Sequence, residues 1–248
     1  MPGAEPYAAP GGPGGVLVLH GFTGNPHSMR ALAEGLAGAG LRVEAPLLPG
    51  HGTSVEDMLP TRWSDWSGAA EAAYLDLAGH CERVAVVGLS MGGTLSCWLG
   101  ERHPEVAGLV LVNPLVRPIP ADQQAAVRSL VEAGQRLMDG IGSDIADPAA
   151  VELSYDKTPL EPLLSLLDAA EQVGADLPRI ECPVLLFSSR NDHVVAPDNG
   201  DAIASALGQR CERVWLERSY HVATLDYDRA EIERRAKEFV LRVTAAGG

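Results

Sequence analysis

The sequence has few cysteines, and they do not form a recognisable motif. Four are present in 248 residues, namely Cys81, Cys97, Cys182 and Cys211. None of them belongs to a Cys-x-x-Cys pair, which argues against a disulfide framework and against a structural zinc site. We therefore expect no metal and no other cofactor. A reducing, cytoplasmic setting is the expected environment.

Positive charge and long apolar runs are also scarce. Lys and Arg number 19 against 33 Asp and Glu, which gives a formal net charge of −14. Such a charge opposes binding to nucleic acid and to anionic bilayers. No run of about 18 apolar residues is present, so we expect no stable membrane insertion. Residues 1–14 lack Lys and Arg and are rich in Pro, Gly and Ala, which predicts a flexible N-terminal tail and not a signal peptide.

Apolar residues are plentiful, at 46% of the chain, and are sufficient to bury one large core. Strand-like apolar runs alternate with helix-like segments along most of the sequence. This alternation predicts an α/β fold with a mostly parallel central sheet and flanking helices. We expect residues 15–248 to form a single domain.

The segment Gly88-Leu89-Ser90-Met91-Gly92 joins a predicted strand to a predicted helix. Residues 83–87 form an apolar run typical of a strand buried on both faces, and helically spaced apolar residues follow up to Pro104. The flanking glycines lack the Cβ atoms that would collide at a sharp turn. A serine at this turn projects its hydroxyl out of the sheet, so Ser90 is the candidate nucleophile. A glycine-rich turn in an ordinary βα unit is the alternative.

A serine hydroxyl is a weak nucleophile, so it needs a base and a group that orients the base. His221 follows the last strand-like segment, and Asp192 directly follows the strand-like segment before it. The chain order Ser90, Asp192, His221 is that of α/β hydrolases, and all three would lie at the carboxyl ends of strands. Asp201 and Asp226 remain alternative acids.

A second strand-like run, Gly15–His20, leads into a loop with glycines on both sides of Phe22. These glycines let the backbone approach a bound substrate closely. The backbone N–H groups of Phe22 and Met91 are therefore candidate donors of an oxyanion hole. His20 and His51 are expected to order their loops through hydrogen bonds.

Taken together, these motifs resemble the bacterial carboxylesterase and monoacylglycerol lipase family of α/β hydrolases, over about residues 15–240. The resemblance implies Ser90 as nucleophile, Asp192 as acid, His221 as base, and Phe22 and Met91 as oxyanion donors. The segment at about 115–174 matches no family motif. The motifs that carry the resemblance are Leu19-His20-Gly21-Phe22-Thr23-Gly24, Leu48-Pro49-Gly50-His51-Gly52, Gly88-Leu89-Ser90-Met91-Gly92-Gly93, Asn191-Asp192 and Ser219-Tyr220-His221-Val222.

The unmatched segment breaks the alternation of strands and helices, which predicts a small helical cap inserted at about 115–174. Ala121–Met138 has helical periodicity. A second helix is predicted with Thr158 as N-cap, Pro159 in its first turn and Glu161 completing a capping box. Its leucines could either line an acyl pocket or pack on the core, and both alternatives stay open. They are Leu160, Leu163, Leu164, Leu166 and Leu167.

The predicted activity is hydrolysis of short-to-medium-chain carboxylic esters through an acyl-enzyme. A small-molecule ester resembling a monoacylglycerol is the expected substrate, as the resemblance implies. An acyltransferase with the same triad, or a ligand receptor of negligible turnover, is an alternative. Peptidase activity also stays open, and the oligomeric state is not set by the sequence.

Overall fold

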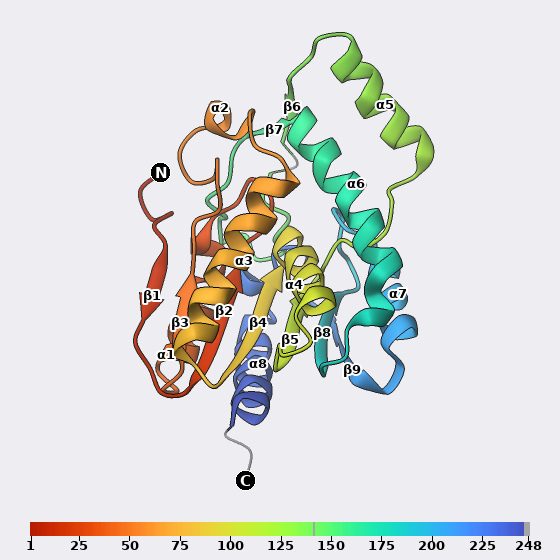
Figure 1. The fold of residues 1–248 in the computed structure, drawn as a ribbon. Helices are drawn as coiled ribbons and strands as arrows, with labels where there is room; N and C mark the ends of the chain where they lie inside the picture. The colour runs from red at the N-terminus through yellow and green to blue at the C-terminus, as the bar shows by residue number, and fades with distance from the viewer. Residues whose placement is uncertain (141, 246–248) are drawn as a thin grey trace.

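The computed structural model describes residues 1–140 and 142–245, and within them a seven-stranded sheet forms the centre of the molecule (Figure 1). All strands of this sheet except β1 run parallel to one another. Residue 141 of the predicted insertion and residues 246–248 of the predicted domain lie outside the described residues. The strands, in sheet order, are β1 (Tyr7–Ala9), β3 (Arg42–Ala45), β2 (Gly14–Leu19), β4 (Arg83–Leu89), β5 (Gly108–Val112), β8 (Val184–Ser189) and β9 (Cys211–Leu216).

The alternation of side chains along the buried strands divides the apolar core into two layers. In β2, Val16 and Val18 belong to one core cluster, and Leu17 and Leu19 belong to the other. The first layer is covered by α1 (Arg30–Ala37) and α8 (Arg229–Thr244). The second is covered by α3 (Trp63–His80), α4 (Met91–Arg102), α6 (Leu160–Asp176) and α7 (Asp198–Leu207). The predicted α/β-hydrolase fold is confirmed, and none of the helices described is long and apolar enough to span a bilayer.

The N-terminal segment is not the flexible tail that its composition predicted. Tyr7–Ala9 pairs antiparallel with β3 and forms the edge of the sheet. The N-terminal ammonium donates to the carbonyl of Gly52 at 2.6 Å, and Ala4 is buried. Edge pairing uses backbone N–H and C=O groups, which small residues offer as well as large ones. The prediction of a flexible tail from composition is therefore wrong for the part of this segment that forms β1.

The insertion between β5 and β8 also differs from the predicted pair of helices. The first helix, α5 (Ala121–Glu132), ends where it does because Gly134 adopts φ +84° and reverses the chain. Leu137–Asp139 then forms β6, which pairs with β7 (Lys157–Pro159). The predicted capping box is wrong, because Thr158 lies in β7 and no side chain caps α6. Glu161 instead forms an ion pair with Arg62, which precedes α3.

The leucines of α6 divide between core packing and partial exposure. Leu164, Leu166 and Leu167 are buried in the core layer that also contains Met91. Leu163 is only partly buried against that layer. The core-packing alternative therefore describes most of this helix.

Glu101, near the end of α4, gives the protein a pH-dependent stability. Burial, followed by the nearby Asp176, raises the pKa of Glu101 to about 8, and one carboxyl oxygen has no hydrogen-bond partner. A glutamate in an unfolded chain has a pKa of ~4.3. Below that pH Glu101 is protonated in both the folded and the unfolded protein. As the pH rises from about 4.3 to 8, Glu101 loses its proton in the unfolded protein but keeps it in the folded one. The free energy of unfolding therefore falls over this range.

The variant Glu101→Gln, which mimics the protonated side chain, is expected to remove this pH dependence. At pH 8 it should be more stable than the wild type by about 4 to 5 kcal/mol, with little difference near pH 4. Thermal unfolding over this pH range measures the effect. Glu105→Gln, which changes an exposed carboxylate, is the control. Parallel pH curves for wild type and Glu101→Gln would contradict the assignment.

Candidate active site

Ser90 lies on the sharp turn between β4 and α4. Its backbone adopts φ 54° and ψ −119°, a conformation that non-glycine residues rarely adopt. A Cβ atom on Gly88 would lie 2.1 Å from the Gly92 oxygen, and one on Gly92 would lie 2.2 Å from the Leu19 oxygen. Only glycine fits this approach of strand and helix. The turn is therefore built to hold a serine side chain at the carboxyl edge of the sheet.

The loop after β2 lies directly against this serine. A Cβ atom on Gly21 would stand 3.4 Å from the Cβ of Ser90. Thr23 has φ 60°, and its hydroxyl donates to the Phe22 carbonyl at 2.6 Å. The Phe22 ring packs edge to face on Trp66, with 5.6 Å between centroids. These contacts fix the Phe22 backbone near Ser90, while Met91 supplies a first-turn N–H of α4, which has no acceptor within the helix.

His221 and Asp192 form a buried pair on the loops after β9 and β8. Nδ1 of His221 lies 2.7 Å from Oδ2 of Asp192, and the two side chains are 8% and 1% exposed. The other oxygen of Asp192 accepts the N–H groups of Val194 and Val195, each at 2.8 Å. Because the Asp192 carboxylate accepts a hydrogen bond from Nδ1–H, the neutral ring leaves Nε2 unprotonated and free to act as a base.

Charges around the imidazole set its proton affinity. Burial, the largest single cause, lowers the pKa of His221, while Asp192 raises it through its charge and its hydrogen bond. Glu152 and Asp144 add to the effect, and the pKa lies above its ordinary value. The negative charges around the ring therefore favour its imidazolium form.

The two alternative acids make other contacts. Asp226 is 1% exposed, and its carboxylate accepts four backbone N–H groups, from Ala146, Asp147, Tyr220 and Tyr227. Asp201 lies on α7 and pairs with Arg213. Of the three candidates, the structure brings Asp192 to His221.

Asn113, just after β5, was not singled out from the sequence. It has φ 46° and is buried, and its amide group donates to the His221 carbonyl at 2.8 Å. Its amide oxygen accepts the Ser189 N–H at 2.8 Å. The preceding residue, Val112, accepts the Ser90 N–H at 2.9 Å. The ends of β4, β5 and β8 and the His221 loop are thus connected through two adjacent residues. A polar residue directly after a buried strand was the available signal.

Residues 143–155 of the insertion, which we call the strap, contact the loops of the site. The Tyr155 hydroxyl donates to the Gly50 carbonyl at 2.8 Å, and the Tyr155 N–H donates to the Thr23 carbonyl at 3.2 Å. The buried side chain of Asn25 donates to the Leu153 carbonyl at 2.6 Å. The strap therefore holds the loop of Phe22 from the side of the insertion.

Glu152, also in the strap, is a partly buried carboxyl group near His221. Burial raises the pKa of Glu152 to about 7, although His221 and Ser154 act in the opposite direction. A Cβ atom on Gly24 would lie 3.0 Å from its Oε1. The site thus carries an acceptor beyond the Asp192 and His221 pair. No motif marks Glu152 in the sequence.

His20 and His51 order their loops, as predicted. Nε2 of His20 accepts the Leu48 N–H at 3.1 Å, so Nδ1 is the protonated nitrogen and donates to the Gly21 carbonyl at 2.9 Å. Burial lowers the pKa of His20 to about 3 and that of His51 to about 4. Both rings are therefore neutral at physiological pH. His20 joins the loops after β2 and β3 through its bond to Leu48, and His51 bonds within its own loop, with 3.0 Å between its Nδ1 and the Pro49 carbonyl oxygen.

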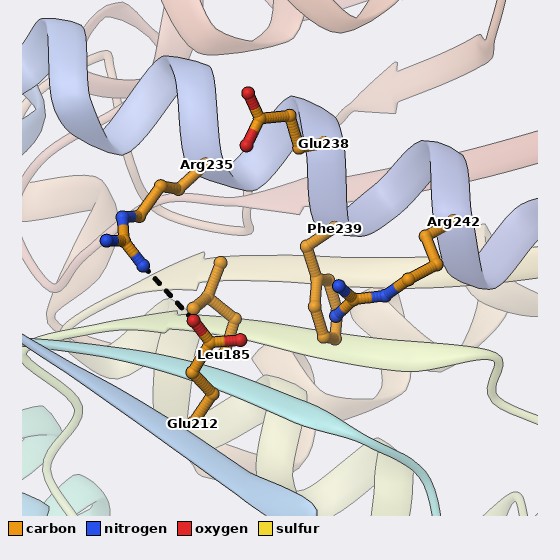
Figure 2. A pocket seen from close by; sticks show the side chains of 6 residues that line it. All are labelled: Leu185, Glu212, Arg235, Glu238, Phe239 and Arg242. Atoms are coloured by element: carbon orange, nitrogen blue, oxygen red, sulfur yellow. Dashed lines mark hydrogen bonds and ion pairs between the residues drawn. The ribbon is translucent and has the colours of Figure 1, made fainter.

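A shallow hollow of about 60 Å³ lies elsewhere, between α8 and the strands β8 and β9 (Figure 2). Glu212 is the second residue of β9, and it forms an ion pair with Arg235 at 3.1 Å. This places the hollow toward the amino ends of the strands, whereas Asp192 and His221 follow the carboxyl ends. We assign no chemistry to it. Its lining is Leu185, Glu212, Arg235, Glu238, Phe239 and Arg242.

A serine on a strained strand-to-helix turn, beside a parallel sheet that also carries a hydrogen-bonded His–Asp pair, is the arrangement of serine hydrolases with the α/β-hydrolase fold. A family model described as serine aminopeptidase, S33, matches residues 13–228. The chain belongs to this family of hydrolases.

Individual relatives narrow the resemblance. The chain is 47% identical to a thermostable monoacylglycerol lipase of Bacillus sp. strain H-257, over 96% of this chain and 95% of that protein. It is 29% identical to a carboxylesterase of Bacillus subtilis strain 168, over 95% and 96% of the two chains. A solved structure from work on LipS and LipT, two metagenome-derived lipolytic enzymes, superposes with a TM-score of 0.93 at 42% identity, covering 98% of this chain and 99% of that one. The predicted resemblance to carboxylesterases and monoacylglycerol lipases is confirmed.

Proposed function

We propose that this hydrolase cleaves monoacylglycerol-like carboxylic esters with Ser90 as nucleophile, His221 as base and Asp192 as the group that orients the base. The 2.7 Å bond between His221 and Asp192, joined through Asn113 to the strand ends around Ser90, is the observation that carries this proposal. The similarity to an enzyme named monoacylglycerol lipase supports the substrate class.

The reaction follows from these positions. Nε2 of His221 takes the hydroxyl proton of Ser90 while Oγ bonds to the ester carbonyl carbon, and the N–H groups of Phe22 and Met91 stabilise the resulting oxyanion. The tetrahedral intermediate collapses, and the alcohol leaves with the proton from His221. Water then attacks the acyl-enzyme and gives a proton to Nε2 of His221. The second tetrahedral intermediate collapses, Nε2 returns that proton to Oγ of Ser90, and the carboxylic acid leaves.

The position of Glu152 supports a substrate whose alcohol portion carries free hydroxyl groups. The alcohol portion of a monoacylglycerol is glycerol, which carries two free hydroxyl groups in the substrate. When the substrate binds, these hydroxyls lose hydrogen bonds to water and need partners in the site. A partly buried carboxyl near the base, in either protonation state, accepts a hydrogen bond from such a hydroxyl. An ester of a simple alcohol has no group for this contact.

Replacing Glu152 by alanine is expected to raise KM for a monoacylglycerol by about tenfold, the equivalent of one hydrogen bond of ~1.4 kcal/mol. KM for the methyl ester of the same acid should change by less than about twofold, because that ester lacks the hydroxyls. Both esters are assayed at one pH, so that any change in the protonation of His221 affects the two substrates equally. Val151→Ala, at the exposed neighbouring position, is the control. Equal losses on both esters would sink the alcohol assignment.

The environment and the acyl-chain preference are further parts of the proposal. The four cysteines are free, which supports action in a reducing, cytoplasmic setting. A preference for short-to-medium acyl chains is tested with p-nitrophenyl esters of increasing length. Product analysis in the presence of glycerol distinguishes hydrolysis from acyl transfer.

A further inference from the structure

Asp144, in the strap, joins the two loops that carry His221 and Asp192. Its Oδ2 accepts the backbone N–H of His193, next to Asp192, and the backbone N–H of His221, both at 3.1 Å. Its Oδ1 lies 2.7 Å from Nδ1 of His193. The Asp144 side chain is 11% exposed, and within the part of the chain that the structure describes its carboxylate bonds to His193 and His221 alone.

The strap is attached to the His221 loop at further points. The Asp144 carbonyl accepts the Val222 N–H at 3.1 Å. From the other direction, the carboxylate of Asp226 accepts the Ala146 and Asp147 N–H groups of the strap, at 2.8 and 3.0 Å, and the Tyr220 N–H at 2.8 Å. Val222 is thus bonded to the strap directly, and Tyr220 is connected to it through the Asp226 carboxylate.

This arrangement matters because His221 lies in a loop and not in a regular element. Bonds between a carboxylate and backbone N–H groups are charge-assisted and directional, so they define where the loop lies. A catalytic base must stand within hydrogen-bond reach of its proton, and small displacements of such a group reduce the rate strongly. A carboxylate that bonds to both loops fixes the separation of the two partners.

We propose that Asp144 is a positioning residue, which holds the imidazole of His221 and the carboxylate of Asp192 in register from the inserted strap. This inference rests on the proposed function of Ser90, His221 and Asp192. Asp144 also acts electrostatically. The charged groups that face His221 are Asp192, Glu152 and Asp144, and each favours the imidazolium, while His193 faces Asp144.

Two substitutions separate the hydrogen bonds from the charge. In Asp144→Asn the amide oxygen still accepts both backbone N–H groups, while the negative charge is lost. In Asp144→Ala both are lost. Asp139→Asn removes a charge from an exposed residue of the same insertion, whose partner is Lys157, and is the matched control. The measurements are kcat and KM for one ester, the pH profile of kcat/KM, and thermal unfolding.

We expect Asp144→Ala to lower kcat by ~10- to 100-fold with KM within about threefold of wild type, and Asp144→Asn to recover most of that loss. In Asp144→Asn the acidic limb of kcat/KM should move to lower pH, because the lost negative charge no longer favours the imidazolium. Asp139→Asn should change neither quantity.

The inference is overturned if Asp144→Ala keeps wild-type kcat well below its unfolding temperature, or if Asp144→Asn leaves the acidic limb in place. A variant that fails to fold removes only the alanine result, and the asparagine pH profile still decides. Failure of the proposed function would show separately, as full activity in a Ser90→Ala protein whose Asp144 is intact.

Discussion

Replacement of Ser90 by alanine is expected to lower kcat for ester hydrolysis by about 10⁵- to 10⁶-fold, the range found when the nucleophile of a serine hydrolase is removed. Alanine has no oxygen to form the acyl-enzyme, so only the residual effect of the oxyanion donors and of substrate binding is left. Initial rates with a p-nitrophenyl ester, on protein freed of wild-type contamination, provide the measurement.

The fold should tolerate this change, because the substitution removes one hydroxyl and keeps the Cβ atom at the turn. Unfolding temperatures of wild type and Ser90→Ala should therefore be similar. Ser129→Ala, on the exposed helix α5, is the control for a serine outside the site. A Ser90→Ala protein with more than a few per cent of wild-type kcat would mean that another residue attacks the ester.

The second large effect is expected for Asp192→Asn, with kcat lower by about 10⁴-fold, the size known for the equivalent change in a serine protease. The amide oxygen can still accept the N–H groups of Val194 and Val195, so the loop should keep its conformation. The amide NH₂ then faces Nδ1 of His221 and donates to it. The imidazole proton moves to Nε2, and the base that Ser90 needs is lost.

Asp226→Asn provides the contrast for Asp192→Asn. Its NH₂ group would face two of the four backbone N–H donors that now bind the carboxylate, so this variant should unfold at lower temperature. Asp192→Asn should show the opposite pattern, with stability near wild type and little activity. Near wild-type kcat in Asp192→Asn, with an inactive but stable Asp226→Asn, would show that Asp226 is the acid.

The parts of the site that could be predicted from the sequence are those with local signals. Ser90 lies between two glycines, after an apolar strand and before a helix, and each of these features is visible within about fifteen residues. Asp192 and His221 follow apolar segments that the parallel sheet brings to one edge. Since β4, β8 and β9 are all parallel in one sheet, their carboxyl ends had to meet.

The contacts of the strap could not be predicted, because they depend on where a segment without periodicity crosses the sheet edge. Asp144 lies 77 residues from His221 in the chain, and nothing near either residue indicates the bond between them. The contacts of Glu152 and Tyr155 were likewise not indicated by the sequence around them. The sequence identified an insertion there, but an acidic residue in such a segment cannot be distinguished from one exposed on a surface.

Two errors in secondary structure had local causes. The apolar spacing of Leu137 and Met138 continued the helical period of α5, but Gly134 ended that helix and left both residues in β6. The segment at Tyr7–Ala9 joined the sheet through its backbone, for which side chains give no signal. Both cases follow from interactions that a hydrophobic pattern does not record.

The most direct test of the account is the site of covalent modification by an organophosphonate ester analogue. The phosphorus atom bonds to the activated nucleophile and mimics the tetrahedral intermediate, so labelling requires both the nucleophile and its base. Mass spectrometry of the digested protein should place one adduct on Ser90, and Ser90→Ala should not be labelled. An adduct on another residue, or unchanged labelling in Ser90→Ala, would contradict the assignment of Ser90 as the nucleophile.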